Sequence, residues 1–158
     1  MTVEQKIRSI VEDMEGVSYV FDDWSRVNLK MDKLKLPAVI NILPPSGNLE
    51  YSKGVFKDAP NCAIGFADIA KLDFDGAEND ATIDRCKSMA MEFIARVNNS
   101  KFFEPLQDLI HYSVFYNKLN RNITGIIIEL SLKENVGVCV PYNPKYKEIF
   151  EKWRKLLK

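Results

Sequence analysis

The chain has 158 residues, of which 46% are hydrophobic and 28% charged, and its formal net charge is zero. This length is typical of one domain, which we expect to span residues 1–158. The high hydrophobic fraction excludes an intrinsically disordered chain. The charge balance argues against a nucleic-acid-binding protein, which needs a surplus of Lys and Arg, so we predict no sequence-specific binding of nucleic acid.

Neither a membrane segment nor a secretion signal is visible. No stretch approaches the roughly 20 consecutive apolar residues of a membrane-spanning helix, and the N-terminus lacks a basic region followed by an apolar one. We therefore expect a protein that folds in a cytoplasm and has no membrane partner. The three cysteines, Cys62, Cys86 and Cys139, are widely spaced, and in a reducing compartment such residues behave as small buried hydrophobic groups.

The first residues predict a helix. Thr2 can cap it, and Gln5 stands at the spacing of a capping box. Gly16 is placed to end the helix in a left-handed conformation. Apolar residues recur on one helical face at Val3, Ile7, Ile10, Val11 and Met14.

Residues 17–43 predict strands. A brief strand ends near residues 23–24, and the alternation of Leu29 with Met31 continues after it, with a turn or bulge at residues 32–33. Residues 37–43 form an apolar run that is typical of a buried strand. The sequence Pro44-Pro45-Ser46-Gly47-Asn48 has strong turn chemistry and is expected to end that strand.

Two more strands are predicted before residue 71. Residues 49–56 indicate an exposed, partly polar strand, which Asp58-Ala59-Pro60-Asn61 is expected to break. Residues 62–70 then place large and small side chains on opposite faces. The large ones are Cys62, Ile64 and Phe66, and the small ones are Ala63, Gly65 and Ala67, so that a helix or another backbone can approach the small face closely.

The densest acidic cluster covers residues 73–80. A calcium loop of the EF-hand type needs Gly at its sixth position and Glu at its twelfth, whereas counting from Asp73 gives Glu78 and Asp84. We therefore interpret the carboxylates as the N-terminus of a helix, where they cap N–H groups and meet the positive end of the helix dipole. The helix is predicted from Ala77 or Ala81 to Val97. We predict no bound metal and no cofactor.

The second half of the chain predicts a short helical piece over residues 102–110, then strands over residues 111–119 and 123–133. Residues 135–141 indicate a loop or a short strand. On the first of these strands the apolar face carries Tyr112, Val114 and Tyr116.

His111 is the only histidine and lies in phase with Ser113, on the more polar face of its strand. The chain contains neither a nucleophile elbow nor a phosphate-binding P-loop. We therefore expect His111 to be structural and the protein not to be an enzyme.

A helical extension is predicted over residues 143–158, with Asn143 as its cap and Pro144 at the first helical position. Its end is basic. A basic amphipathic helix can bind a membrane surface or a protein groove, but positive charge also suits any helix C-terminus, and we favour the latter. Its apolar face carries Tyr146, Ile149, Phe150, Trp153, Leu156 and Leu157.

The order of elements predicts an α+β fold. We expect an antiparallel or mixed sheet packed against the N-terminal helix and the long central helix, with a core over residues 2–133 and a further C-terminal helix.

This order resembles that of small tail proteins of tailed bacteriophages and prophages, and more narrowly that of tail terminator or tail completion proteins. The residues that carry the likeness are the proline-opened strand LPAVI (36–40), the strand over 62–70, the long helix through MAMEFI (89–94) and the hairpin that ends in NITGIII (122–128). The resemblance implies an α+β fold, self-assembly into a hexameric ring that ends or joins the tail tube, and no catalysis. It also implies tail-tube or head-completion proteins as partners, and a location in the host bacterial cytoplasm during assembly and then in the virion tail.

A ring subunit needs exposed apolar surfaces for contacts between neighbours. The candidate interface residues are Tyr51, Phe56 and Trp153, and the alternative for each is a place in the core of its own chain. The alternative function is a small α+β ligand- or protein-binding module of a bacterial cytoplasm, which we expect to show a concave apolar pocket with converging polar groups. An enzyme that uses His111 is the third interpretation.

Overall fold

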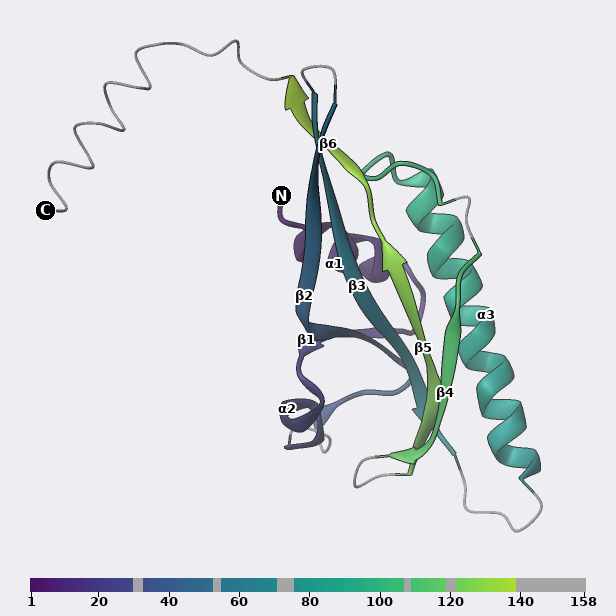
Figure 1. Ribbon diagram of the computed structural model, residues 1–158. Coiled ribbons are helices and arrows are strands. Elements are labelled where there is room, and N and C mark those ends of the chain that lie inside the picture. Colours follow the sequence, from purple (N-terminus) through teal and green to yellow (C-terminus); the bar gives the residue numbers. More distant parts are fainter. Residues whose placement is uncertain (30–32, 53–54, 71–75, 107–108, 119–121, 139–158) are drawn as a thin grey trace, which may run out of the picture.

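A mixed sheet of six strands and three helices make up the part of the chain that our computed structural model describes (Figure 1). That part comprises residues 1–29, 33–52, 55–70, 76–106, 109–118 and 122–138. The predicted α+β class is confirmed. The predicted C-terminal helix, and Trp153 with it, lies outside the described residues. The elements are α1 (Val3–Glu12), β1 (Ser18–Asp22), α2 (Trp24–Leu29), β2 (Ala38–Ser52), β3 (Val55–Ile69), α3 (Ala77–Asn99), β4 (Tyr112–Lys118), β5 (Ile123–Ser131) and β6 (Glu134–Val138).

The strand order is β1-β2-β3-β5-β4, and β6 pairs with β3. β1 and β2 run parallel, with Ser18 opposite Ala38, and α2 lies between them in the chain. The other described pairs are antiparallel. β3 is therefore the central strand. β2 pairs with one side of β3 along most of its length, while β5 and β6 pair with successive parts of its other side.

One face of the sheet carries α1, α3 and the main hydrophobic core. Because side chains alternate along a strand, Cys62, Ile64 and Phe66 of β3 all point to this face, where they meet the buried residues of both helices. The rings of Phe66 and Phe93 contact edge to face, with centroids 5.7 Å apart. The helical residues buried here are Ile7, Ile10 and Val11 from α1, and Ile83, Cys86, Ala90, Phe93 and Val97 from α3.

The opposite face holds a smaller core under α2. Trp24, at the start of α2, contacts Phe115 of β4 edge to face, with ring centroids 5.4 Å apart. The buried members are Val27, Ile40, Ala67, Phe115 and Ile123. This is the face on which the sequence places the small residues of β3. Ala67 belongs to this core, and Gly65 lies against the side chains of Ile40 and Ile42 of β2.

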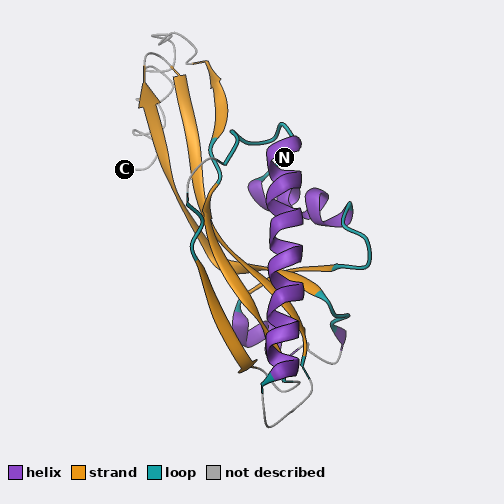
Figure 2. Ribbon diagram, turned by 90° about the vertical axis from the view of Figure 1, so that its right-hand side faces the viewer, coloured by secondary structure: helices purple, strands orange, loops and turns teal. Residues whose placement is uncertain are grey.

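β2 and β3 continue beyond the helices as a long hairpin, which we call the arm and define as residues 46–52 and 55–61 (Figures 1 and 2). The turn predicted at residues 44–48 is wrong, because the strand continues through Ser52. The register shifts between Ile42 and Ser46. The two prolines thus lie in a bulge, where a residue that has no N–H to donate is tolerated.

The break predicted at residues 58–61 is also wrong, since β3 runs unbroken from Val55 to Ile69. Pro60 stands opposite Gly47, and a Cβ atom at residue 47 would lie 3.0 Å from the Cα of Pro60. A glycine on the facing strand therefore makes room for a proline inside this strand pair.

α1 begins as predicted. The Thr2 hydroxyl accepts from the Gln5 N–H at 3.3 Å, and the Gln5 side-chain oxygen accepts from the Thr2 N–H at 2.9 Å, which completes the capping box. The helix ends at Glu12 with Asp13 as its C-cap. Gly16 is left-handed, with φ of 71°, as predicted, but it lies in the turn beyond the cap.

Two further predictions are wrong. Residues 24–29 form α2, whereas strand alternation was expected to pass through Leu29; six residues are too few for a helical period to show. Among the described residues of 102–110, none is helical, and Phe103 is buried from an irregular segment. By contrast, α3 begins at Ala77, the earlier of its two predicted starts, and β6 takes the place of the predicted loop or short strand.

Candidate functional site

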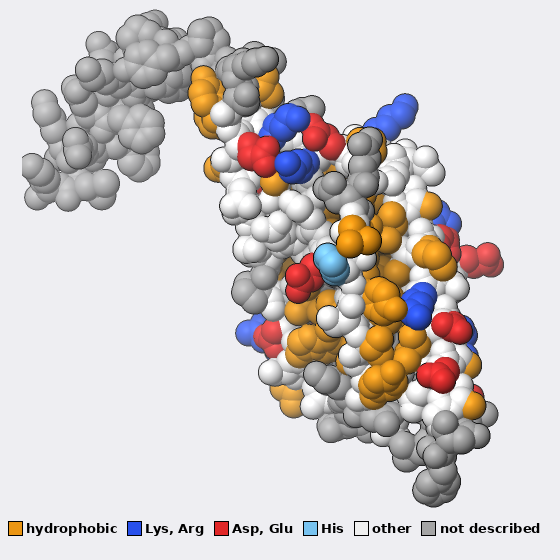
Figure 3. Space-filling view, turned by 45° about the vertical axis from the view of Figure 1, so that its right-hand side comes forward, with side chains coloured by type: hydrophobic (Ala, Val, Ile, Leu, Met, Phe, Trp, Pro, Cys, Tyr) orange, Lys and Arg blue, Asp and Glu red, His pale blue; other side chains and the backbone are white. Residues whose placement is uncertain are grey.

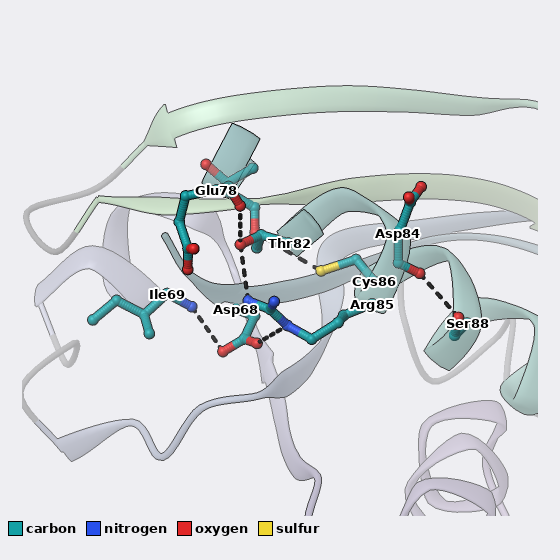
Figure 4. Close-up of polar contacts among 9 residues, drawn as sticks. Asp68, Ile69, Glu78, Thr82, Asp84, Arg85, Cys86 and Ser88 are labelled. Atoms are coloured by element: carbon teal, nitrogen blue, oxygen red, sulfur yellow. Dashed lines mark hydrogen bonds and ion pairs between the residues drawn. The ribbon is translucent and has the colours of Figure 1, made fainter. Parts of the chain in front are cut away.

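Polar contacts cluster where the start of α3 meets the end of β3 (Figure 4). The Arg85 guanidinium donates from Nε to Asp68 Oδ2 at 3.1 Å and from Nη2 to Thr82 Oγ1 at 2.9 Å. The Thr82 hydroxyl donates in turn to the carbonyl oxygen of Glu78 at 2.8 Å. Because these groups bond to one another, the cluster fastens α3 to the sheet.

The two described cysteines are chemically quiet. Burial raises the pKa of the Cys62 thiol to about 11 and that of the Cys86 thiol to about 12. A thiol that keeps its proton at neutral pH is a poor nucleophile and a poor metal ligand. Both therefore act as small buried side chains, as predicted, whereas Cys139 lies outside the described residues.

The acidic cluster behaves as the start of a helix. Glu78 and Asp80 lie in the first turn of α3, at the positive end of its dipole, as predicted. The N-cap, however, is the left-handed Gly76, so a carboxylate does not occupy the cap position as expected. Residues 73–75 lie outside the described part. Within the described ranges, no three His, Cys, Asp or Glu side chains are grouped so as to hold a metal ion.

His111 is exposed directly before β4, and Ser113 is exposed on the strand. The side chain of β4 that enters the core is Phe115, which lies in phase with them. The face of β4 with His111 and Ser113, which is the more polar one in the sequence, thus contains the buried Phe115. The apolar face of β4 is the exposed one.

A ligand site usually offers roughly 300–1,000 Å³ and an apolar lining with a few converging polar groups. A hollow of about 500 Å³ at the base of the arm is lined by Ser46, Asn61, Cys62, Ala63, Glu129, Leu130 and Ser131. A hollow of about 190 Å³ is lined by Val20, Val27, Lys33 and Leu34. The first has the size but a lining that mixes polar and apolar side chains about equally, and the second has the apolar lining but is small.

Exposed apolar side chains gather on one face of the arm. Leu49, Tyr51 and Phe56 are 74%, 61% and 40% exposed. Tyr51 stands opposite Phe56, and their ring centroids are 4.7 Å apart. Two of the three predicted interface residues are thus exposed side by side. We call Leu49, Tyr51 and Phe56 the arm row.

Ion pairs connect the arm to the body of the protein. Glu50 of β2 pairs with Lys133 at 3.1 Å, and Lys57 of β3 pairs with Glu104 at 2.6 Å. Figure 3 shows acidic and basic side chains side by side near this end of the molecule. Glu50 and Lys57 face each other across the two strands, and by alternation they point away from the arm row. The ion pairs therefore attach the arm to the body on the side opposite the arm row, and they leave the arm row exposed.

A second exposed apolar row lies on β4. Tyr112, Val114 and Tyr116 are 52%, 37% and 53% exposed, and we call them the β4 row. The residues opposite Tyr112 and Val114 on β5 belong to the main core, so this row points to the face that carries α3. Lys87 of α3 reaches over the Tyr112 ring, 5.3 Å from its centroid. Figure 3 shows hydrophobic side chains gathered over this part of the surface.

The sequence predicts the alternation of the β4 row but not its exposure. α3 packs on the strands at the centre of the sheet, and β4 lies at the sheet edge beyond the helix. A sequence feature that could have indicated an apolar edge strand is the lack of charged residues from Tyr112 through Asn117, in the first strand of a hairpin.

A scan against known protein families finds no match for this chain, and no curated protein matches it either. None of the helices in the described ranges combines the length and the hydropathy that crossing a membrane requires.

Proposed function

We propose that this protein is a non-enzymatic structural subunit of a phage or prophage tail, namely a ring-forming tail terminator, tail completion or head–tail joining protein. The observation that carries the proposal is the pair of exposed apolar rows, one on the arm and one on β4. Monomeric soluble proteins seldom expose contiguous apolar patches that have no partner. Two different surfaces on one chain suit contacts between successive copies, which close into a ring when the rotation per copy allows it.

The resemblance of residues 2–133 to tail terminator and tail completion proteins supplies the setting. It leads us to expect six copies in the ring, with tail-tube or head-completion proteins as partners. The observed mixed sheet with an N-terminal helix and a longer central helix is compatible with that resemblance.

Light scattering after gel filtration, combined with negative-stain imaging, tests the proposal. We expect a particle several times the 18.1 kDa mass of one chain, either alone or after addition of tail-tube protein encoded next to it. A chain that stays monomeric and does not bind that protein contradicts the proposal. A monomer that instead binds a cellular protein through the two rows supports the second candidate, a protein-binding module.

A further inference from the structure

The sheet has open edges at both apolar rows. Among the described strands, β5 alone pairs with β4, so the outer edge of β4 has no strand beside it. On the other side of the sheet, β1 pairs with β2 only as far as Asp22 opposite Ile42. The outer edge of β2 from Ser46 to Ser52 therefore also lacks a strand partner within the described residues.

Each edge is protected at one end only: β4 has a bulge between Phe115 and its last residue, Lys118, and β2 has a bulge with two prolines directly before the arm. Natural proteins block such edges with Lys or Pro, with bulges or by keeping the strand short. β4 has no charged residue and no proline from Tyr112 through Asn117. The edge segment of the arm carries one charge, Glu50, and that carboxylate is paired with Lys133. The regular stretch of each edge, Tyr112–Phe115 on β4 and residues 46–52 on β2, lacks these blocks and is therefore competent to accept a further strand.

The apolar rows of the two edges match in direction. β4 spans Tyr112–Lys118 with a bulge after Phe115, and the arm segment 46–52 is long enough to pair with its regular part. Phe56 lies an even number of positions before Phe66 on the unbroken β3, so the arm row points to the face of the main core. The β4 row points to that face as well. A sheet that continues from one edge to the other thus brings both rows together on one side.

Charge is complementary at the two edges. Asp58 stands opposite Leu49 beside the arm row. Lys87, whose ammonium group also lies 3.8 Å from an Asp84 carboxylate oxygen, covers Tyr112 in the β4 row. Contact between the rows brings a carboxylate and an ammonium group toward the same apolar surface, where opposite charges attract and help to set the register.

We propose that β4 of one copy pairs with residues 46–52 of β2 in the next copy, so that the sheet continues from subunit to subunit and the arm row packs on the β4 row. This inference rests on the proposed function and names the contact that builds its ring. The contact joins two different edges, and each copy therefore keeps one of them available for a further neighbour.

A pair of charge substitutions tests the contact. Val114→Lys places an ammonium group in the β4 row, and Leu49→Lys places one in the arm row; both positions are exposed, so the fold tolerates them. We expect each variant to lose the wild-type assembly and to run at the 18.1 kDa of one chain. Leu29→Lys on α2, at a position 84% exposed, is the matched control and should assemble like the wild type.

Mixing the two variants gives a result that a folding defect cannot mimic. Val114→Lys retains an intact arm, and Leu49→Lys retains an intact β4, so an equimolar mixture should form a heterodimer of twice 18.1 kDa that does not grow further. Light scattering measures this mass.

Four outcomes would overturn the inference. If both variants assemble normally, the ring uses other surfaces and the proposed function survives. If only one variant loses assembly, or if the mixture gives no heterodimer, the two rows are not each other's partners. If the wild-type chain is monomeric with and without tail-tube protein, the inference and the proposed function fail together.

Discussion

Gly125 on β5 lies directly opposite Phe115 on β4, and the missing side chain at residue 125 makes room for the phenyl ring. A Cβ atom at this position would lie 2.9 Å from Cζ of Phe115 and 2.0 Å from the carbonyl oxygen of Phe66. The ring in turn packs under Trp24 of α2. One glycine thus allows β4 to join the sheet while the core of the second face is filled.

We expect Gly125→Ala to lower the free energy of unfolding by at least ~3 kcal/mol, the upper part of the range for overpacked cores, because one of the clashing atoms belongs to the backbone and cannot rotate away. Chemical denaturation followed by circular dichroism measures the change.

Gly65→Ala is the control for that substitution. It lies on the neighbouring strand, but its Cβ would lie 3.6 Å from the Ile40 Cβ, an ordinary contact distance. We expect it to change the stability by less than about 1 kcal/mol, as Gly-to-Ala changes without strain do. Equal effects of the two substitutions would contradict the steric explanation.

The sequence predicts local signals well where one residue decides the geometry. The capping box of α1, the left-handed Gly16 and the start of α3 at Ala77 all appear as expected. The prolines at residues 44, 45 and 60 misled the prediction, because turn chemistry and strand bulges use the same residue type. Only the pairing with the facing strand, through a bulge and through Gly47, decides between them.

The exposure of the candidate surfaces also depends on neighbouring elements that local sequence does not reveal. Tyr51 and Phe56 are exposed where the sequence predicted exposed strand residues. The sequence predicts the β4 row only as the apolar face of its strand, because alternation does not reveal whether a helix covers that face. α3 packs over the centre of the sheet and leaves the edge strand open, which is a property of the assembled fold and not of the strand.

Removing the cap of α1 should weaken the fold. The Thr2 hydroxyl satisfies the Gln5 N–H, and α1 contributes Ile7 and Val11 to the main core. We expect Thr2→Ala to lower the free energy of unfolding by about 1 kcal/mol, as is typical for a lost N-cap. Thr2→Ser keeps the hydroxyl and should retain most of the stability. If both variants unfold at the same denaturant concentration, the cap does not contribute.

Cys62 and Cys86 should resist thiol reagents in the folded protein. Cys62 is 2% exposed and Cys86 fully buried, and burial raises the pKa of both thiols. We expect alkylation followed by peptide mass mapping to modify these two residues only after denaturation. Rapid modification of either one under native conditions would contradict the burial and would point to local opening.

The same raised pKa values predict a loss of stability at alkaline pH. Above the ordinary thiol value of 9.0, the unfolded chain releases the Cys62 proton, whereas the folded chain holds it up to about 11. Between pH 9.0 and about 11 the unfolded state is therefore stabilised relative to the folded state, and the free energy of unfolding falls as the pH rises. Cys62→Ala should show a shallower decline than the wild type, although it is less stable at neutral pH. Denaturant midpoints measured across the interval give the two slopes.

The ion pair between Lys57 and Glu104 should control the arm more than the overall stability. The hydrogen bond and the charge of Glu104 raise the pKa of Lys57, but the pair is exposed, and exposed pairs add little to global stability. It does connect the projecting hairpin to the segment that follows α3. We expect Glu104→Gln to leave the unfolding midpoint almost unchanged and to speed hydrogen exchange of the β3 amides near residue 57 several-fold, because local opening becomes easier.

Glu92→Gln removes a comparable pair with Arg96 within α3 and should leave the arm amides unaffected. If the two variants exchange alike in the arm, the ion pair does not hold it, and the direction of the arm row is fixed by the strand pairing alone.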